Sequence, residues 1–183
     1  MIAEKMKSYV ENSSVIRAMF EEGAKMAAVY GAENVYDFSL GNPNVAAPAQ
    51  VRQAIEEIIT GEDPVMVHGY MSNAGFEDVR SAVADSLNRR FQTAFHEENI
   101  IMTVGAAGGM NVIFRTILNP GDEVLTFAPY FGEYRAYVSN YDGILKAVEP
   151  NTQSFQPDLE KFERMITVKT KAVIVNSPNN PTG

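Results

Sequence analysis

A glycine-rich stretch in the middle of the chain has the composition of an anion-binding turn. Gly105-Ala106-Ala107-Gly108-Gly109 follows an apolar segment and precedes residues with helical spacing. The first N–H groups of a helix have no partner within it and lie at the positive end of its dipole. Small side chains let a phosphate approach those groups closely. The same residues also suit a tight turn that packs a helix on a sheet. They lack both the Gly-Lys-Ser/Thr of nucleotide triphosphatases and the dinucleotide spacing Gly-x-Gly-x-x-Gly.

Two further stretches place aromatic and amide side chains directly after apolar segments. In Ala128-Pro129-Tyr130-Phe131, one ring could stack on a heteroaromatic ligand, or the two rings could be a helix-start staple and a core residue. The stretch 176–183, Asn-Ser-Pro-Asn-Asn-Pro-Thr-Gly, could place an asparagine amide against a phenolate oxygen, although an ordinary turn has the same composition. Upstream, Gly41 could offer its N–H to a carboxylate, and Tyr70 precedes a helix. Both types are also common as turn residues and surface rings.

The elements that must position these residues alternate between helices and apolar strands. Periodicity and capping residues predict helices at 12–30, 48–60, 75–91, 105–118, 130–141 and 159–166. Strands are predicted at 99–104, 124–127, 144–148 and 172–176, with a short strand or extended segment at 35–40. Asn119-Pro120-Gly121-Asp122 predicts a type II turn. Four strands separated by helices favour an α/β fold, with a mostly parallel sheet covered by helices on both faces. Such sheets bind ligands at the carboxyl ends of their strands, where the three unusual stretches lie.

Composition and charge exclude several functional classes. The chain has 183 residues, of which 45% are hydrophobic and 21% charged, as in an ordinary globular domain. A net charge of −8 argues against nucleic acid or an anionic membrane as a partner. The absence of cysteine excludes disulfides and thiolate metal sites, and two histidines make a histidine zinc site improbable. We find no signal-peptide pattern and no membrane-length apolar run, and therefore expect a cytoplasmic protein.

In their order and spacing, these motifs resemble those of class I/II aminotransferases, the aspartate-aminotransferase-like pyridoxal-phosphate enzymes of fold type I. The resemblance runs from about Ser14 to Gly183, and its most specific piece is the stretch 176–183. Val-Gly-Ala-Ala, Asn-Pro-Gly-Asp-Glu-Val and Pro-Tyr-Phe-Gly-Glu-Tyr support it. The resemblance implies that residues 1–47 are an N-terminal segment of the small domain. Residues 48–183 would then be the first part of a three-layer cofactor-binding large domain, with the rest of the large domain and the C-terminal small domain absent.

The resemblance also assigns roles around pyridoxal 5′-phosphate. Gly105 would set the turn in which Ala106 and Ala107 bind the phosphate. Phe131 would stack on the ring, where the family commonly has Trp or Tyr. Asn180 would donate to the cofactor's 3′ oxygen, and Gly41 would touch the substrate carboxylate. Tyr70 would reach the phosphate in the partner subunit's site, which implies a homodimer.

The implied reaction is transamination between an L-amino acid, with an aspartate-like one as a candidate, and a 2-oxo acid. The family's Schiff-base lysine has no counterpart, because none of the seven lysines lies in the serine-rich lysine motif. We therefore expect the chain to hold cofactor-binding residues but no catalytic residue, to require no metal, and to be inactive by itself. Two alternatives stay open: a carbon–sulfur or β-elimination lyase on the same fold, and a non-catalytic truncated paralogue that acts as a binding or dimerisation module.

Overall fold

The computed structural model describes residues 2–11, 15–38, 41 and 43–183. Its contacts form two compact units, Met1–Tyr70 and Met71–Gly183. We describe each unit by itself. The predicted domain boundary between residues 47 and 48 stays a prediction.

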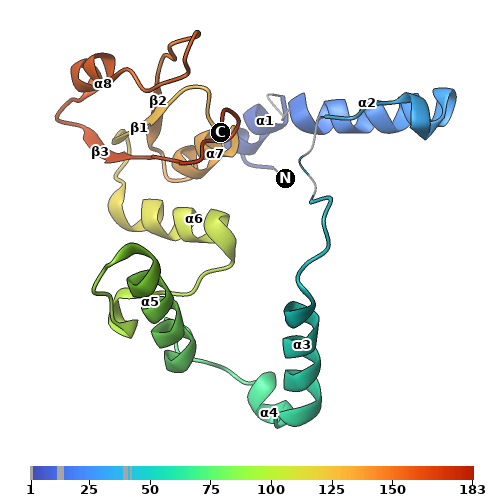
Figure 1. Cartoon of the computed structure of the whole chain (residues 1–183). Helices are drawn as coiled ribbons and strands as arrows, with labels where there is room; N and C mark the ends of the chain where they lie inside the picture. Colours follow the sequence, from blue (N-terminus) through green and yellow to red (C-terminus); the bar gives the residue numbers. More distant parts are fainter. Residues whose placement is uncertain (1, 12–14, 39–40, 42) are drawn as a thin grey trace. The chain divides into compact units, whose positions relative to one another are not determined.

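The first unit is helical (Figure 1). Its elements are α1 (Glu4–Glu11), α2 (Val15–Tyr30), the 3-10 helix η1 (Ala32–Asn34), α3 (Ala49–Gly61) and α4 (Pro64–Val67). The helix predicted at 12–30 is confirmed from Val15 onward, and positions 12–14 lie outside the described residues. In α3, Gly61 is the last helical residue rather than the first one beyond the end, and Glu62 N–H still donates to Ile58 O. Residues 35–38 form no strand, and 39–40 are not described.

The second unit carries the remaining elements. They are α5 (Glu77–Phe91), η2 (Glu97–Asn99), α6 (Gly105–Ile117), β1 (Glu123–Phe127), α7 (Glu133–Ser139), β2 (Ile144–Val148), α8 (Leu159–Met165) and β3 (Thr170–Val173). The helix predicted at 130–141 is shorter at both ends. After Ser139 the chain turns away, with Asp142 in the left-handed region at φ 58°. Among the described residues, no helix combines the length and apolar character needed to cross a membrane.

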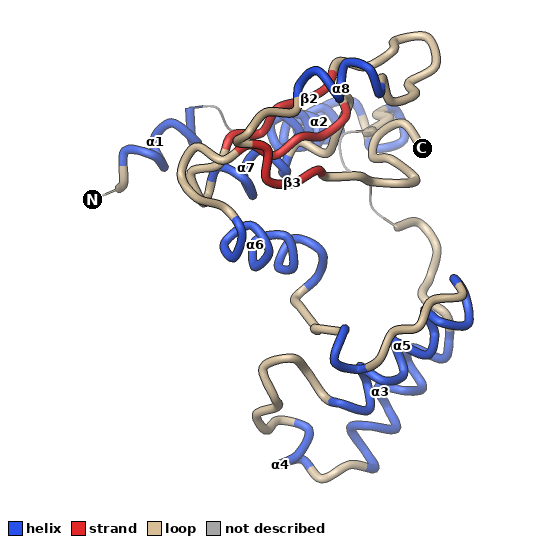
Figure 2. Tube along the Cα trace, turned by 90° about the vertical axis from the view of Figure 1, so that its left-hand side faces the viewer, coloured by secondary structure: helices blue, strands red, loops and turns tan. Residues whose placement is uncertain are grey.

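The three strands form one parallel sheet in the order β2-β1-β3 (Figure 2). The chain adds β2 on one side of β1 and then crosses to the other side to add β3. Glu123 pairs with Ile144 of β2 and with Thr170 of β3, whereas Val124 pairs with Ala172, so the register of β3 shifts by one residue at Lys171. The type II turn before β1 is confirmed, because Gly121 has φ +83° and Asp122 N–H donates to Asn119 O at 3.0 Å.

The strand predicted at 99–104 is wrong. Its first residue belongs to η2, and the residues that follow, of which Ile100 is extended, lie outside the sheet. A hydrogen bond from Met102 N–H to Ala74 O, at 2.9 Å, holds this segment. Ile101 is 68% and Val104 94% exposed. An apolar extended segment becomes a strand only where another strand accepts and donates its backbone hydrogen bonds.

Helices cover both faces of the sheet. Val124 packs with Phe114 of α6 and Val138 of α7, and all three are buried. Successive strand residues point to opposite faces, so Phe127 faces away from Val124. Its ring lies 5.4 Å from that of Phe162 in α8. The predicted parallel α/β architecture is therefore confirmed, and the described residues form three strands of the sheet rather than four.

Candidate functional site

The segment that leaves β1 holds a cluster of three rings. Ala128 N–H still donates to Val148 O at the end of β2, at 2.9 Å. Beyond it, the ring of Tyr130 stacks parallel to Tyr134 at 6.3 Å, and Phe131 meets the same ring edge-on at 5.7 Å. Tyr134 is buried and Phe131 half-buried. Tyr134 therefore fixes the orientation of the Phe131 ring, whose remaining surface stays accessible.

The loop that leaves β3 is anchored to the loop that leaves β1. Ile174 N–H donates to Leu125 O at 2.8 Å, which continues the β1–β3 pairing past the end of β3. In the loop, the amide of Asn179 donates to Pro129 O at 3.0 Å and to the Thr182 hydroxyl at 2.9 Å. Gly183 N–H closes the turn on Asn179 O at 2.7 Å. Asn179 is half-buried, whereas Asn180 is exposed.

Asn179, which joins the two loops, is therefore a site residue that the sequence motifs do not single out. Its signal was present in the sequence as two consecutive asparagines enclosed by two prolines. One asparagine in such a pair can hold the loop while its neighbour presents an amide to a ligand. The sequence does not distinguish the asparagine that holds the loop from the one that faces the ligand.

The N-terminus of α6 presents the small residues that were predicted to receive an anion. Gly105 has φ +68°, a left-handed backbone that an L side chain rarely adopts. Its N–H donates to Thr103 O at 2.9 Å, and the Thr103 hydroxyl donates to Gly105 O at 3.1 Å. Ala106 and Ala107 follow in the first turn and are exposed. Their N–H groups precede the first intrahelical donors, so they can receive an oxyanion.

The structure brings some of the predicted site residues together and leaves others apart. Phe131 and Asn180 lie on two loops that the Asn179–Pro129 hydrogen bond joins. Among the described residues, no hydrogen bond or ring contact connects Ala106 or Ala107 to either of them. Gly41 and Tyr70 belong to the first unit. Both are exposed, and a Cβ on Gly41 would meet no atom within 4 Å.

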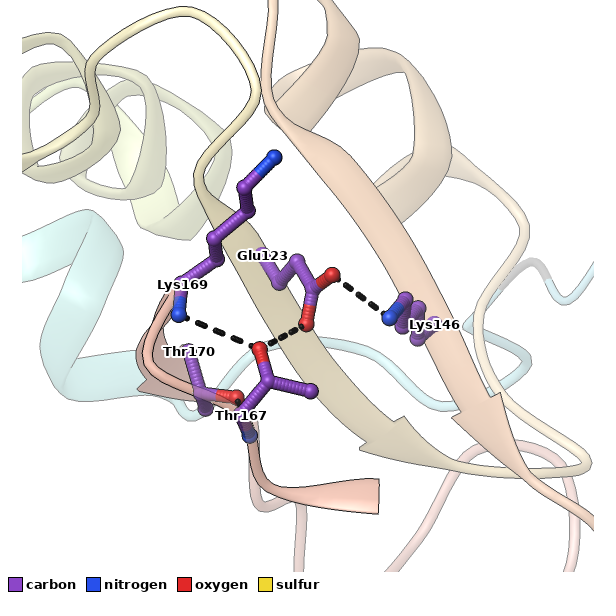
Figure 3. A network of polar contacts seen from close by, with 5 residues as sticks. All are labelled: Glu123, Lys146, Thr167, Lys169 and Thr170. Atoms are coloured by element: carbon purple, nitrogen blue, oxygen red, sulfur yellow. Dashed lines mark hydrogen bonds and ion pairs between the residues drawn. The ribbon is translucent and has the colours of Figure 1, made fainter.

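A second polar cluster surrounds Glu123, the first residue of β1, with Lys146 in the middle of β2 and Thr167 before β3 (Figure 3). Glu123 is only 7% exposed. Its Oε1 accepts a hydrogen bond from Lys146 Nζ at 2.5 Å, and its Oε2 accepts one from the Thr167 hydroxyl at 2.8 Å. These two donors, first the ammonium of Lys146 and then Thr167, lower the pKa of the Glu123 carboxyl against the opposing effect of burial. Glu123 lies in the Asn-Pro-Gly-Asp-Glu-Val motif, but the sequence assigns it no role.

Comparisons with known proteins identify relatives of the whole chain. The family model of aminotransferase class I and II matches residues 33–183. The aspartate/prephenate aminotransferase of Thermus thermophilus is 35% identical over 144 residues, which are 78% of this chain and 36% of that protein. A putative aminotransferase of Bacillus subtilis, YugH, is 34% identical over 182 residues, 97% of this chain and 45% of the relative.

Solved structures give the same result. A crystal structure of an aminotransferase from Eubacterium rectale is 42% identical, with a TM-score of 0.93, and the match covers 99% of this chain and 46% of that one. A mutant of Thermus thermophilus aspartate aminotransferase is 29% identical, with a TM-score of 0.87, over 100% of this chain and 46% of the other. The chain thus spans less than half the length of the relatives it matches. The match over residues 33–183 places this chain in the family of class I and class II aminotransferases.

Proposed function

We propose that this chain supplies the phosphate-binding and ring-binding part of a pyridoxal-phosphate-dependent aminotransferase that acts on an L-amino acid and a 2-oxo acid. The observation that carries the proposal is the Asn179–Pro129 hydrogen bond, which joins the loops of Phe131 and Asn180 at the carboxyl ends of adjacent strands. Ligands of parallel α/β sheets bind at this end. Relatives named aspartate aminotransferases favour an aspartate-like substrate.

The residues present fit the cofactor group by group. Ala106 and Ala107 have exposed N–H groups for a phosphate, in a turn that the left-handed backbone of Gly105 sets. Phe131 offers a ring whose tilt Tyr134 fixes, and a flat heteroaromatic ring can stack on it. Asn180 has an exposed amide that can donate to a phenolate oxygen. When bound, the cofactor supplies an electron sink that allows an amino acid to release its α proton.

The first unit contributes two further residues to the proposal. Gly41 offers its backbone N–H to the substrate carboxylate. Tyr70, whose side chain is fully exposed, reaches the cofactor phosphate of a second subunit, so that the active protein is a homodimer. Turnover needs a Schiff-base lysine, which the seven lysines of this chain do not provide in the expected motif. We therefore expect binding by this chain and no transamination by it alone.

Binding is tested with pyridoxine 5′-phosphate, which has no aldehyde and so cannot react with surface lysines. Isothermal titration of the full chain should show that it binds more tightly than pyridoxine, which lacks the phosphate. Ala106→Pro removes one N–H donor at a helix start, where proline is tolerated. Loss of a hydrogen bond to a charged group should weaken binding by roughly 10- to 100-fold. The control is Ala49→Pro, which likewise removes an N–H donor in the first turn of a helix, α3.

Two outcomes contradict the proposal. Equal affinity for pyridoxine and for its phosphate would mean that the chain has no site for the phosphate. Equal weakening of binding by A106P and A49P would show that the phosphate does not bind at the start of α6. Asn180→Ala should weaken both ligands to a similar degree, because its amide contacts the ring oxygen and not the phosphate. The homodimer is tested by sedimentation equilibrium of the chain with and without the ligand, and a monomer in both conditions would exclude it.

A further inference from the structure

Glu123, the first residue of β1, links that strand to β2 and to the turn before β3 (Figure 3). Its carboxylate contacts Lys146 in β2 and Thr167 in the turn between α8 and β3. Its backbone N–H also donates to Lys169 O in that turn, at 2.8 Å. Both the main chain and the side chain of Glu123 therefore hold the turn from which β3 starts.

The turn itself is tied by hydrogen bonds that converge on Thr167. Thr167 N–H donates to the Thr170 hydroxyl at 2.8 Å, and Thr170 N–H donates to Thr167 O at 3.0 Å. Lys169 N–H donates to the Thr167 hydroxyl at 3.1 Å, while that hydroxyl donates to Glu123. Within the part of the chain that the structure describes, the Thr167 hydroxyl is therefore the side-chain hydrogen bond that links the carboxylate to the turn.

The register of β3 changes immediately after this turn. Glu123 is opposite Thr170, but Val124 is opposite Ala172, so Lys171 is an additional residue in β3. Because of this additional residue, Ala172 and Ile174 lie on the face that packs against Val124. A slip of one residue turns a strand's side chains to the other face and moves the following chain by about 3.3 Å. The position of the additional residue in β3 therefore determines where the rest of β3 and the loop after it lie.

The loop beyond β3 depends on that position. Ile174 N–H donates to Leu125 O, and five residues later Asn179 donates to Pro129 O. A slip would remove both bonds and displace Asn180 from the Phe131 loop. We propose that Glu123 is a positioning residue, which fixes the register of β3 from the amino end of β1 and thereby places the 176–183 loop at the carboxyl ends of the strands. This rests on the proposed function, in which that loop contacts the cofactor.

The test compares two variants that each cut one arm of the carboxylate. Thr167→Val removes the hydroxyl at nearly constant volume and keeps the Lys146 ion pair, whereas Lys146→Met removes the ion pair and keeps Thr167. Amide hydrogen exchange is measured by NMR on the full chain at Ile174, which donates to Leu125, and at Ile144, which donates to Asp122 O on the β2 side. The ratio of the two rates cancels changes in global stability.

T167V should raise the ratio of the Ile174 rate to the Ile144 rate by about tenfold, because it frees only the β3 side. K146M should leave the ratio unchanged or lower it, and Thr167→Ser should restore the wild-type ratio. If Glu123 only stabilised the sheet, loss of its Thr167 contact and loss of its Lys146 contact would have the same effect. Equal ratios of the Ile174 to the Ile144 exchange rate in T167V and K146M would therefore overturn the proposal.

Ligand binding supplies the second readout. T167V should weaken pyridoxine 5′-phosphate binding, while K146M should leave the affinity within about twofold. If T167V changes the exchange ratio but not the affinity, the register is fixed by Glu123 and the link to the loop's function is wrong. If the wild-type chain binds no ligand at all, the proposed function fails, and the exchange ratio still decides whether Glu123 sets the register.

Discussion

The two units bury their apolar side chains to different degrees. In α3 of the first unit, Val51, Ile55 and Ile58 recur with helical spacing, yet each is about half exposed. In the second unit, Val124 and Val138 have no exposed surface. Helical periodicity predicts that a helix has an apolar face, but it contains no information about what covers that face. The second unit has a sheet that supplies the cover, and the predictions below probe this difference.

The largest expected effect comes from truncating the same kind of side chain in each unit. Leu125→Ala removes a fully buried side chain from β1, and such substitutions cost about 2–5 kcal/mol of unfolding free energy. Ile55→Ala removes a side chain that is 52% exposed and should cost less than about 1 kcal/mol. Urea unfolding monitored by circular dichroism measures both. Equal losses would mean that the face of α3 is covered in solution.

The next effect concerns acid stability of the second unit. The lowered pKa of Glu123 means that its contribution to stability is fully present above the pKa of the unfolded state, about 4.3 for glutamate, and is lost as the pH falls through the lower folded value. Asp122 and Asp158 also have lowered pKa values, through the N–H groups of Asn119 and Lys161 respectively. Glu123→Gln should therefore reduce, without abolishing, the fall of the urea midpoint between pH 6 and pH 3. An unchanged slope would show that Glu123 does not contribute.

A pair of glycine substitutions should act in opposite directions. A Cβ would meet no atom within 4 Å at Gly121 or at Gly61, so space does not distinguish them. Gly121 has φ +83° in the turn before β1, and alanine there should cost about 1–2 kcal/mol. Gly61 ends α3, and alanine there should stabilise the first unit by up to about 1 kcal/mol. Thermal unfolding followed by circular dichroism measures both, and destabilisation by G61A would contradict the assigned end of α3.

The smallest expected effect is that of a surface ion pair in the first unit. Arg52 Nε lies 2.7 Å from Glu56 Oε1, one turn apart on α3, with both side chains largely exposed. A double-mutant cycle with R52A and E56A should give a coupling below about 0.5 kcal/mol, since solvent screens such pairs. The same cycle applied to Lys146 and Glu123 should give a larger coupling. A larger coupling energy for Arg52–Glu56 than for Lys146–Glu123 would contradict this difference between the two units.

Most elements could be predicted from the sequence, because local signals set them. Helix α8 lies where the Asp158 cap and its apolar spacing put it, with Asp158 Oδ1 accepting the Lys161 N–H at 2.9 Å. Helices α1 and α4 were not predicted, although Asp63 and Pro64 form a recognisable start of α4. The strand at 99–104 failed because strand formation depends on a neighbour, which a local pattern cannot supply. The additional residue at Lys171 likewise depends on pairing between distant segments.

The candidate site was predictable in its location but not in its internal connections. The positions of Gly105 and Phe131 after apolar segments were visible in the sequence: Gly105 begins α6, and Phe131 lies in the loop between β1 and α7. The contacts of Tyr134 and Asn179 depend on which side chains point inward. That is determined by packing between segments that are distant in the sequence. Assignment of each residue to a group of the cofactor stays a prediction until binding is measured.

The central place of β1 in the sheet has a consequence for the order in which the chain folds. Strand β1 pairs with β2 roughly 20 residues further on and with β3 nearly 50 residues further on, and closing the longer loop costs about 0.7 kcal/mol more in chain entropy. We therefore expect the parallel β1–α7–β2 unit to form first and β3 to dock later, which pulse-labelled hydrogen exchange during refolding would detect. The loop that carries Asn179 and Asn180 then acquires its place last, so that a chain with only β1 and β2 paired has the phosphate-binding turn and Phe131 but lacks the Asn180 amide in its final place.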